Sequence, residues 1–117
     1  MRLFFDVGNS RCKFVTESNN KLSAIKYKAA EEINQDWLLA SFANVTQCLI
    51  ADVANSNVCD VIEAWCKKLL IPCQRMVSES QKNGIRCAYD NPQTFGVDRW
   101  LTILGANSLF PQQHCLI

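Results

Sequence analysis

The order of its apolar segments constrains the fold of this chain more than any other feature of the sequence. Residues 2–7 form a short run rich in aromatic and β-branched side chains, and the turn-forming Gly8-Asn9-Ser10 separates it from a second such run at 12–16. A second turn, Asn19-Asn20, leads into a third candidate strand near residues 22–28. Strand-type runs joined by short polar turns predict a three-stranded antiparallel meander.

After this meander, helix-type patterns alternate with apolar runs of strand length. Apolar side chains at helical spacing predict helices around residues 31–42, 58–69 and 97–109, and the apolar runs at 47–53 and 74–77 predict strands between them. Because a crossover helix makes successive strands parallel, the order β-β-β-α-β-α-β-α predicts an α/β fold. We expect a mixed five-stranded sheet with helices on its faces.

The end of the sequence predicts one more apolar strand, which begins at His114-Cys115-Leu116-Ile117. A domain seldom ends on an unpartnered apolar strand. We therefore expect residues 1–112 to form one domain and residues 113–117 to be the first strand of a second domain. On this interpretation the 117 residues are the N-terminal half of a longer protein or a truncated form of it.

Composition excludes several function classes. Apolar residues make up 49% of the chain, but no run approaches the ~20 apolar residues of a membrane-spanning helix. Twelve Lys and Arg residues are offset by 11 Asp and Glu residues, which leaves a net charge of +1 and no basic footprint for general nucleic-acid binding. We expect a cytoplasmic protein with neither a membrane nor a nucleic acid as its partner.

Seven cysteines are a high and odd number for a chain of this length. None form a CxxC pair, and His114 has no second histidine with which to complete a typical zinc site. Cys59, Cys66 and Cys73 follow one another at steps of seven residues, but Pro72 would end a helix before Cys73. We interpret the cysteines as free thiols that pack as small hydrophobes in a reducing compartment.

The first candidate site is the hairpin between the first two strands. It comprises Asp6, Val7, Gly8, Asn9, Ser10, Arg11, Cys12 and Lys13. Gly8 permits a positive φ and a close backbone approach, so backbone N–H groups could surround a phosphate while Lys13 adds a positive charge. Asp6 could hold a hydrated Mg²⁺. The same residues also fit an ordinary hairpin, because Gly-Asn is common in turns.

The second candidate site surrounds the start of the third helix. Tyr89 and the Asn91-Pro92 turn precede Gly96, Val97, Asp98 and Arg99. The helix dipole favours a charged carboxylate in the first turn, and such a carboxylate can accept the proton of a substrate hydroxyl. Arg99 could bind an anionic or carbonyl group. The alternative is that Asp98 only caps the helix and that Arg99 lies in solvent.

Taken together, Asp6-Val7-Gly8-Asn9-Ser10 with Lys13 and the later Gly96-Val97-Asp98-Arg99 resemble the type III pantothenate kinases. This family belongs to the superfamily of sugar kinases, actin and heat-shock chaperone ATPases. The resemblance implies a ribonuclease-H-like domain that is one half of an actin-like duplicated fold. It also implies ATP-dependent phosphorylation of pantothenate to 4'-phosphopantothenate, the first step of coenzyme A biosynthesis.

The resemblance also implies roles for individual residues. Asp6 to Lys13 would bind ATP, with Asp6 holding Mg²⁺ through water. Tyr89 and Gly96 to Arg99 would bind pantothenate, and Asp98 would be the catalytic proton acceptor. The second phosphate loop, the adenosine contacts, a monovalent-cation site for K⁺ or NH₄⁺ and much of a homodimer surface would lie in the other half of the protein.

Two other classes of protein stay open. The chain could be a regulatory protein, similar to an accessory transcription factor, that acts by binding a partner, although its near-neutral charge argues against direct DNA contact. It could also be another kinase or ATPase of the same superfamily, such as a sugar kinase or a chaperone. Residues 89–99 distinguish these options, because sugar kinases generally need more hydroxyl-binding side chains than this segment contains.

Overall fold

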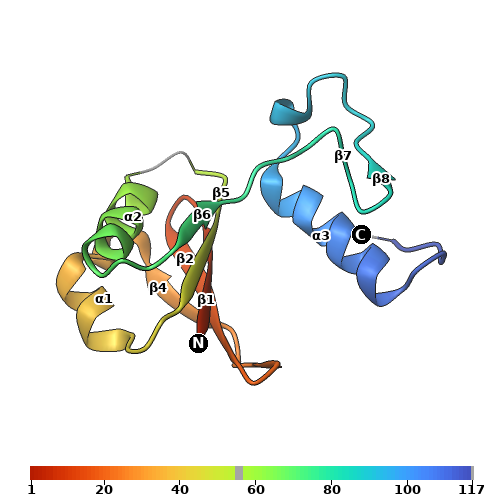
Figure 1. Cartoon of the computed structure of the whole chain (residues 1–117). Coiled ribbons are helices and arrows are strands. Elements are labelled where there is room, and N and C mark those ends of the chain that lie inside the picture. Colours follow the sequence, from red (N-terminus) through yellow and green to blue (C-terminus); the bar gives the residue numbers. More distant parts are fainter. Residues whose placement is uncertain (55–56, 117) are drawn as a thin grey trace. The chain divides into compact units, whose positions relative to one another are not determined.

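The computed structural model describes residues 1–54 and 57–116 as a mixed α/β structure with a mixed sheet and three α-helices. The chain forms two compact units, Met1–Met76 and Val77–Ile117. Figure 1 follows the chain through the sheet, the helices and the later hairpin.

The sheet of the first unit is built around β1 (Arg2–Val7). On one side β1 pairs antiparallel with β2 (Arg11–Ser18), and on the other it pairs parallel with β5 (Gln47–Asp52). β6 (Cys73–Arg75) then pairs parallel with β5. The predicted meander and the predicted parallel crossovers are both confirmed, and together they make the sheet mixed.

The third predicted strand is divided into β3 (Lys21–Leu22) and β4 (Lys26–Ala29). Both pair antiparallel with β2, so the sheet has six strands and the expected number of five is wrong. The interruption has a local cause at Ser23. The Thr16 N–H donates to Ser23 Oγ at 3.0 Å, and the Ser23 N–H donates to the Thr16 carbonyl at 2.8 Å. A serine hydroxyl thus replaces one rung of the ladder and bends the strand at this point.

The first predicted helix begins later than expected. Glu31 and Glu32 lie in a separate 3-10 turn, η1 (Ala30–Glu32), and α1 covers Gln35–Ser41. The side chain of Asn34 determines this start, because its Oδ1 accepts a hydrogen bond from the Trp37 N–H at 2.9 Å. An asparagine at this position satisfies an N–H group that the first helical turn leaves unpaired.

The second helix, α2 (Val58–Lys68), lies where its apolar pattern predicts it. Asn57 occupies the N-cap position, but its side chain accepts no capping hydrogen bond. The sequence also predicts capping oxygens at residues 55 and 56, and these two positions lie outside the described residues.

The core of the first unit lies between one face of the sheet and the helices α1 and α2 (Figure 1). Alternation along β1 buries Leu3, Phe5 and Val7 on this face. The ring of Phe42, which follows α1, lies 5.4 Å from Trp37, 5.5 Å from Phe14, 6.0 Å from Phe5 and 6.2 Å from Trp65. The contacts with Phe5, Phe14 and Trp37 are edge-to-face and the contact with Trp65 is tilted, and aromatic pairs of this kind add to the hydrophobic stabilisation of a core.

The second unit contains a short hairpin of β7 (Gln81–Lys82) and β8 (Ile85–Arg86), the 3-10 turn η2 (Pro92–Thr94) and α3 (Val97–Leu109). The sequence predicts a polar loop through Asn83-Gly84, and in the structure these two residues form the turn of this hairpin. Asn83 has φ 51° and Gly84 has φ 79°, the left-handed conformations that a type I′ turn requires. The bounds of α3 agree with the predicted ones.

Residues 114–116 have no regular secondary structure, and Ile117 lies outside the described residues. The assignment of 113–117 to the first strand of a second domain stays a prediction. Among the described residues, no helix combines the length and the apolar character that crossing a bilayer requires.

Substitutions of Leu38 and Leu39, which are neighbours on α1, test where the core lies. Leu38 is fully buried, whereas the side chain of Leu39 is 46% exposed. We expect Leu38→Ala to lower the free energy of unfolding by about 2–5 kcal/mol, because it leaves a cavity. Leu39→Ala should lower it by less than about 1 kcal/mol. Urea unfolding followed by tryptophan fluorescence measures both, and equal losses would contradict this placement of the core.

Candidate active site

The first candidate site is the turn between β1 and β2. Asp6 is the register partner of Lys13, Val7 is that of Cys12, and the Gly8 N–H donates to the Arg11 carbonyl at 3.1 Å. A Cβ atom at Gly8 would lie 2.9 Å from the Arg11 carbonyl oxygen, closer than such contacts allow. Glycine is therefore required here by the tightness of the turn, and the approach of its backbone to a phosphate stays a prediction. Gly8 does not adopt the positive φ that glycine permits, whereas Gly84 does.

The side chains of this segment alternate between two faces of the sheet. Val7 and Cys12 are fully buried on the face that carries the core, so only their backbone groups could contact a ligand. Burial raises the pKa of the Cys12 thiol to about 12. Asn9, Ser10 and Arg11 are exposed at the turn, and the Arg11 guanidinium lies 4.7 Å from the centre of the Tyr27 ring.

Asp6 and Lys13 lie together on the opposite face of the sheet. The Lys13 ammonium is 2.8 Å from Asp6 Oδ2, and this hydrogen bond raises the pKa of Lys13, which therefore stays protonated at neutral pH. The Asp6 side chain is 37% exposed, so water reaches it. A single solvated carboxylate at the end of a strand suits hydrated Mg²⁺, which retains most of its waters. The residues present thus fit the predicted metal.

A second acidic residue, Asp52, ends the neighbouring strand β5 and was not among the predicted site residues. It is the register partner of Val7, so its side chain lies on the core face, opposite to that of Asp6. Its Oδ1 accepts the Ala54 N–H at 3.0 Å, and its Oδ2 lies 3.9 Å from the Arg75 guanidinium. An acidic residue directly after a buried apolar run, as at Asp6, was the signal that could have identified it.

Arg75 connects this strand end to α2. Besides Asp52, its guanidinium pairs with Asp60 Oδ1 at 2.7 Å and with Glu63 Oε1. The hydrogen bond that Arg75 Nε donates to Glu63 raises the pKa of Arg75. These contacts join the last residue of β6 to α2, so they stabilise the scaffold beside the hairpin without forming part of the predicted site.

The second candidate site lies at the N-terminus of α3, in the second unit. Gly96 is the N-cap residue, and Asp98 lies in the first turn, as expected. A Cβ atom at Gly96 would lie 2.8 Å from Asp98 Oδ1, so the carboxylate folds back over the start of the helix and glycine makes room for it. Asp98 and Arg99 are exposed, whereas Val97 is buried.

The segment before α3 is held by its own side chains. Asn91 Oδ1 accepts the Gln93 N–H at 3.2 Å, and Thr94 Oγ1 donates to the Asn91 carbonyl at 2.7 Å. The ring of Tyr89 lies 4.8 Å from that of Phe95, which leaves Tyr89 half-exposed beside the approach to Gly96. Tyr89 and the residues at the start of α3 thus belong to one local structure.

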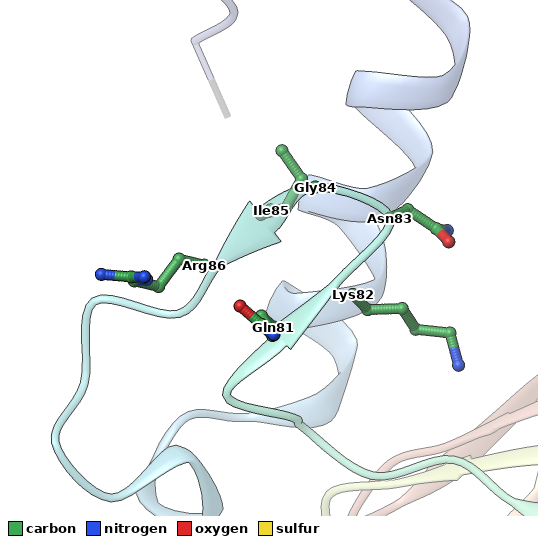
Figure 2. A pocket seen from close by; sticks show the side chains of 6 residues that line it. All are labelled: Gln81, Lys82, Asn83, Gly84, Ile85 and Arg86. Atoms are coloured by element: carbon green, nitrogen blue, oxygen red, sulfur yellow. The ribbon is translucent and has the colours of Figure 1, made fainter.

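A hollow of about 360 Å³ lies at the β7–β8 hairpin and is lined by residues 81–86. Figure 2 shows the side chains of Lys82 and Arg86 pointing away from each other. Lys82 Nζ pairs with Glu79 at 3.2 Å. None of the predicted site residues lines this hollow, and its lining offers no carboxylate. We therefore do not assign the predicted chemistry to it.

The structure brings the predicted residues together as two local groups, one in each compact unit. Asp6 to Lys13 form the hairpin of the first unit, and Tyr89 and Gly96 to Arg99 surround the helix start of the second. From the sequence we also predict that the two groups face each other across a shared cleft, and this stays a prediction.

Similarity to known proteins covers the whole of this chain. A type III pantothenate kinase from Colwellia psychrerythraea is 37% identical over 117 residues, which are 100% of this chain and 47% of that protein. One from Halorhodospira halophila is 35% identical over 127 residues, which cover 100% of this chain and 50% of that protein. One from Nitrosococcus oceani is 28% identical and is matched by 94% of this chain and over 43% of its own length.

The chain thus spans about half the length of the curated relatives it matches. A sequence model of the type III pantothenate kinase family matches residues 2–117, a range that includes both candidate groups. With both groups and a mixed α/β structure in place, the chain belongs to the type III pantothenate kinase family.

Proposed function

We propose that this chain contributes to the phosphorylation of pantothenate by ATP, which gives 4'-phosphopantothenate at the start of coenzyme A biosynthesis. The family match over residues 2–117 carries this proposal. The geometry supports it, because the two groups of residues that the reaction needs are each formed locally. Phosphoryl transfer depends mainly on positioning the reactants and neutralising charge, and both tasks suit a backbone hairpin and a solvated carboxylate.

In this proposal the β1–β2 hairpin binds the phosphates of ATP. The absence of a Cβ atom at Gly8 lets the backbone of the turn lie close to a phosphate, and Asn9 and Ser10 are exposed beside it as donors. Lys13 is protonated and supplies a positive charge on the solvated face of the sheet. Arg11 adds a second cation at the edge of the turn.

Asp6 is the residue that would hold Mg²⁺, through water. The bound ion would offset the negative charge of the phosphates. Without ATP the carboxylate pairs with Lys13. Both groups lie on the same face of the sheet, where Asp6 would be free to bind the hydrated metal ion and Lys13 to bind phosphate oxygens.

The start of α3 would bind pantothenate. Tyr89 offers a half-exposed ring and hydroxyl, Arg99 is available to an anionic or carbonyl group, and Gly96 and Val97 shape the backbone. Asp98 would accept the proton of the primary hydroxyl as the bond to phosphorus forms. Its carboxylate is exposed in the first turn of the helix, where a substrate hydroxyl can reach it.

We further propose a ribonuclease-H-like architecture for residues 1–112 within an actin-like duplicated fold, with residues 113–117 beginning the second domain. The second phosphate loop, the adenosine contacts and the site for K⁺ or NH₄⁺ would belong to that domain. The whole protein would be a homodimer in the cytoplasm. The fact that the chain spans 47% of the Colwellia relative supports this division.

A chimaera tests the proposed function directly. This chain would be joined to the part of the Colwellia psychrerythraea protein that it does not match, and ADP formation would be followed with pantothenate or with glucose as the acceptor. We expect pantothenate-dependent and Mg²⁺-dependent ADP formation, and none with glucose. Activity with glucose, or ATP hydrolysis that pantothenate does not accelerate, would contradict the proposal.

Asp98→Asn tests the proposed proton acceptor in the same chimaera. The substitution keeps the shape of the side chain but removes its basicity, so kcat should fall by about 10²-fold or more while nucleotide affinity changes little. Asp36→Asn is the matched control, because Asp36 is also an exposed carboxylate in the first turn of a helix. Steady-state kinetics with an unchanged kcat for Asp98→Asn would rule out this role.

Gly8→Ala tests the hairpin. Its Cβ atom would meet the Arg11 carbonyl oxygen at 2.9 Å, so the turn must move and its N–H groups lose their arrangement. We expect the affinity of the chimaera for ATP–Mg²⁺, measured by calorimetry, to fall by about tenfold or more, which corresponds to about 1.4 kcal/mol. Gly105→Ala is the control, because a Cβ atom there meets nothing within 4 Å, and nucleotide affinity should not change.

A further inference from the structure

Three cysteines that are far apart in the sequence meet in the first unit. Cys48 comes from β5, Cys66 from α2 and Cys73 from β6, and their Sγ atoms all lie within 4.8 Å of one another. Cys48 and Cys66 are fully buried, whereas Cys73 is partly exposed. None of the residues of this three-cysteine cluster is among those proposed above to bind ATP or pantothenate.

Backbone contacts position the cluster. Cys48 and Cys73 are register partners in the parallel pair β5–β6, so their side chains lie on the same face. The segment from α2 to β6 is bonded at both ends of the turn, because the Ile71 N–H donates to the Cys66 carbonyl at 2.8 Å and the Cys48 N–H donates to the Pro72 carbonyl at 2.9 Å. The three thiols are therefore brought together by the fold itself.

The spacing of the three sulfurs suits a metal ion. An ion bonded to three sulfurs at ~2.3 Å in a plane holds them about 4.0 Å apart. The sulfurs of the cluster are already within 4.8 Å of one another, so small side-chain movements suffice to enclose an ion. A donor set made only of sulfur selects soft, thiophilic metal ions over Mg²⁺ or Ca²⁺.

We propose that Cys48, Cys66 and Cys73 form a three-thiolate binding site for one thiophilic metal ion, Cu(I) or Zn(II). Cu(I) is satisfied by soft thiolate ligands, and three of them complete a trigonal site. Zn(II) favours four ligands, so it would take a water molecule as the fourth, on the side where Cys73 reaches solvent.

Binding exchanges protons for the metal. Each thiol that becomes a ligand forms a metal–sulfur bond and releases its proton to solvent, and the metal keeps its oxidation state. The bound ion would connect β5, β6 and α2, three elements that also meet through apolar packing, hydrogen bonds and the ion pairs of Arg75. It should therefore stabilise the first unit against unfolding, as any ligand of the native state does.

The 117-residue chain itself serves for the test, with Cys87→Ser and Cys115→Ser introduced to remove the two thiols of the second unit. The reduced, metal-free protein would be titrated without oxygen with Cu(I) or Zn(II), each against a chromogenic chelator. Native mass spectrometry would count the bound ions. We expect one ion per chain, and a thermal unfolding midpoint that rises when the ion is added.

Two variants on α2 form the decisive comparison. Cys66→Ser removes a ligand and should lower metal affinity at least tenfold and abolish the rise of the unfolding midpoint. Cys59→Ser is the matched control, because Cys59 is also fully buried on α2 but lies outside the cluster, and it should bind as the parent does. Cys73→Ser repeats the test at a partly exposed position, where a serine disturbs folding least.

Whichever of Cu(I) and Zn(II) binds with the expected dependence on Cys66 and Cys73 identifies the metal of the site. The proposal is overturned if neither ion binds, or if Cys59→Ser weakens binding as much as Cys66→Ser does. It is also overturned if thiol counting after purification in air shows that two of the three cysteines form a disulfide that the metal cannot displace. None of these outcomes depends on the proposed kinase activity.

Discussion

The pairing of β1 with two different neighbours is the constraint on which the first unit depends. β1 is antiparallel to β2 and parallel to β5, and its residues alternate between a buried face and a solvated one. A shift of this register by one residue would exchange the two faces. Phe5 and Val7 would then leave the core, and Asp6 would enter it. The same register therefore secures the packing of the helices and the exposure of the Asp6 carboxylate.

Each of the two units contains one of the candidate groups, and in each group a glycine makes room for its neighbours. In the first, a glycine makes a close turn beside an ion pair, and in the second, a glycine accommodates the carboxylate that folds back over a helix start. At both Gly8 and Gly96 it is the space of a missing Cβ atom that matters, since neither has the left-handed conformation found at Gly84. The proposed reaction uses a compact turn for the charged nucleotide and a helix terminus for the acceptor, in keeping with the different charges of the two substrates.

Long patterns in the sequence predicted the structure well, and short or tertiary features escaped prediction. The apolar faces of α2 and α3 extend over 11 and 13 residues, so their bounds follow from periodicity. β7 and β8 have two residues each, too few for an alternation to show, although the Asn83-Gly84 pair is a recognised hairpin signal. The division of β3 from β4 depends on one hydroxyl, that of Ser23, which no pattern of hydrophobicity records.

The candidate site shows the same division. Asp6, Lys13, Gly96 and Asp98 were found because each lies within a short contiguous motif, and the structure forms each motif locally. The three-cysteine cluster was not anticipated. The helix does end before Cys73, as the sequence indicates, although it ends at Lys68 and thus already before Pro72; the chain then reverses and returns Cys73 to Cys66. Proximity of this kind follows from topology, which spacing along the chain does not encode.

The contacts of Arg75 have a consequence for the place where the chain leaves the first unit, which ends one residue later at Met76. Attraction between charges, at partly exposed positions, anchors this exit, whereas apolar packing holds the layers beneath it. Dissolved ions screen the attraction between these charges but have little effect on the apolar packing. A higher ionic strength therefore weakens the ion pairs that hold the end of the first unit more than it weakens the apolar packing of that unit.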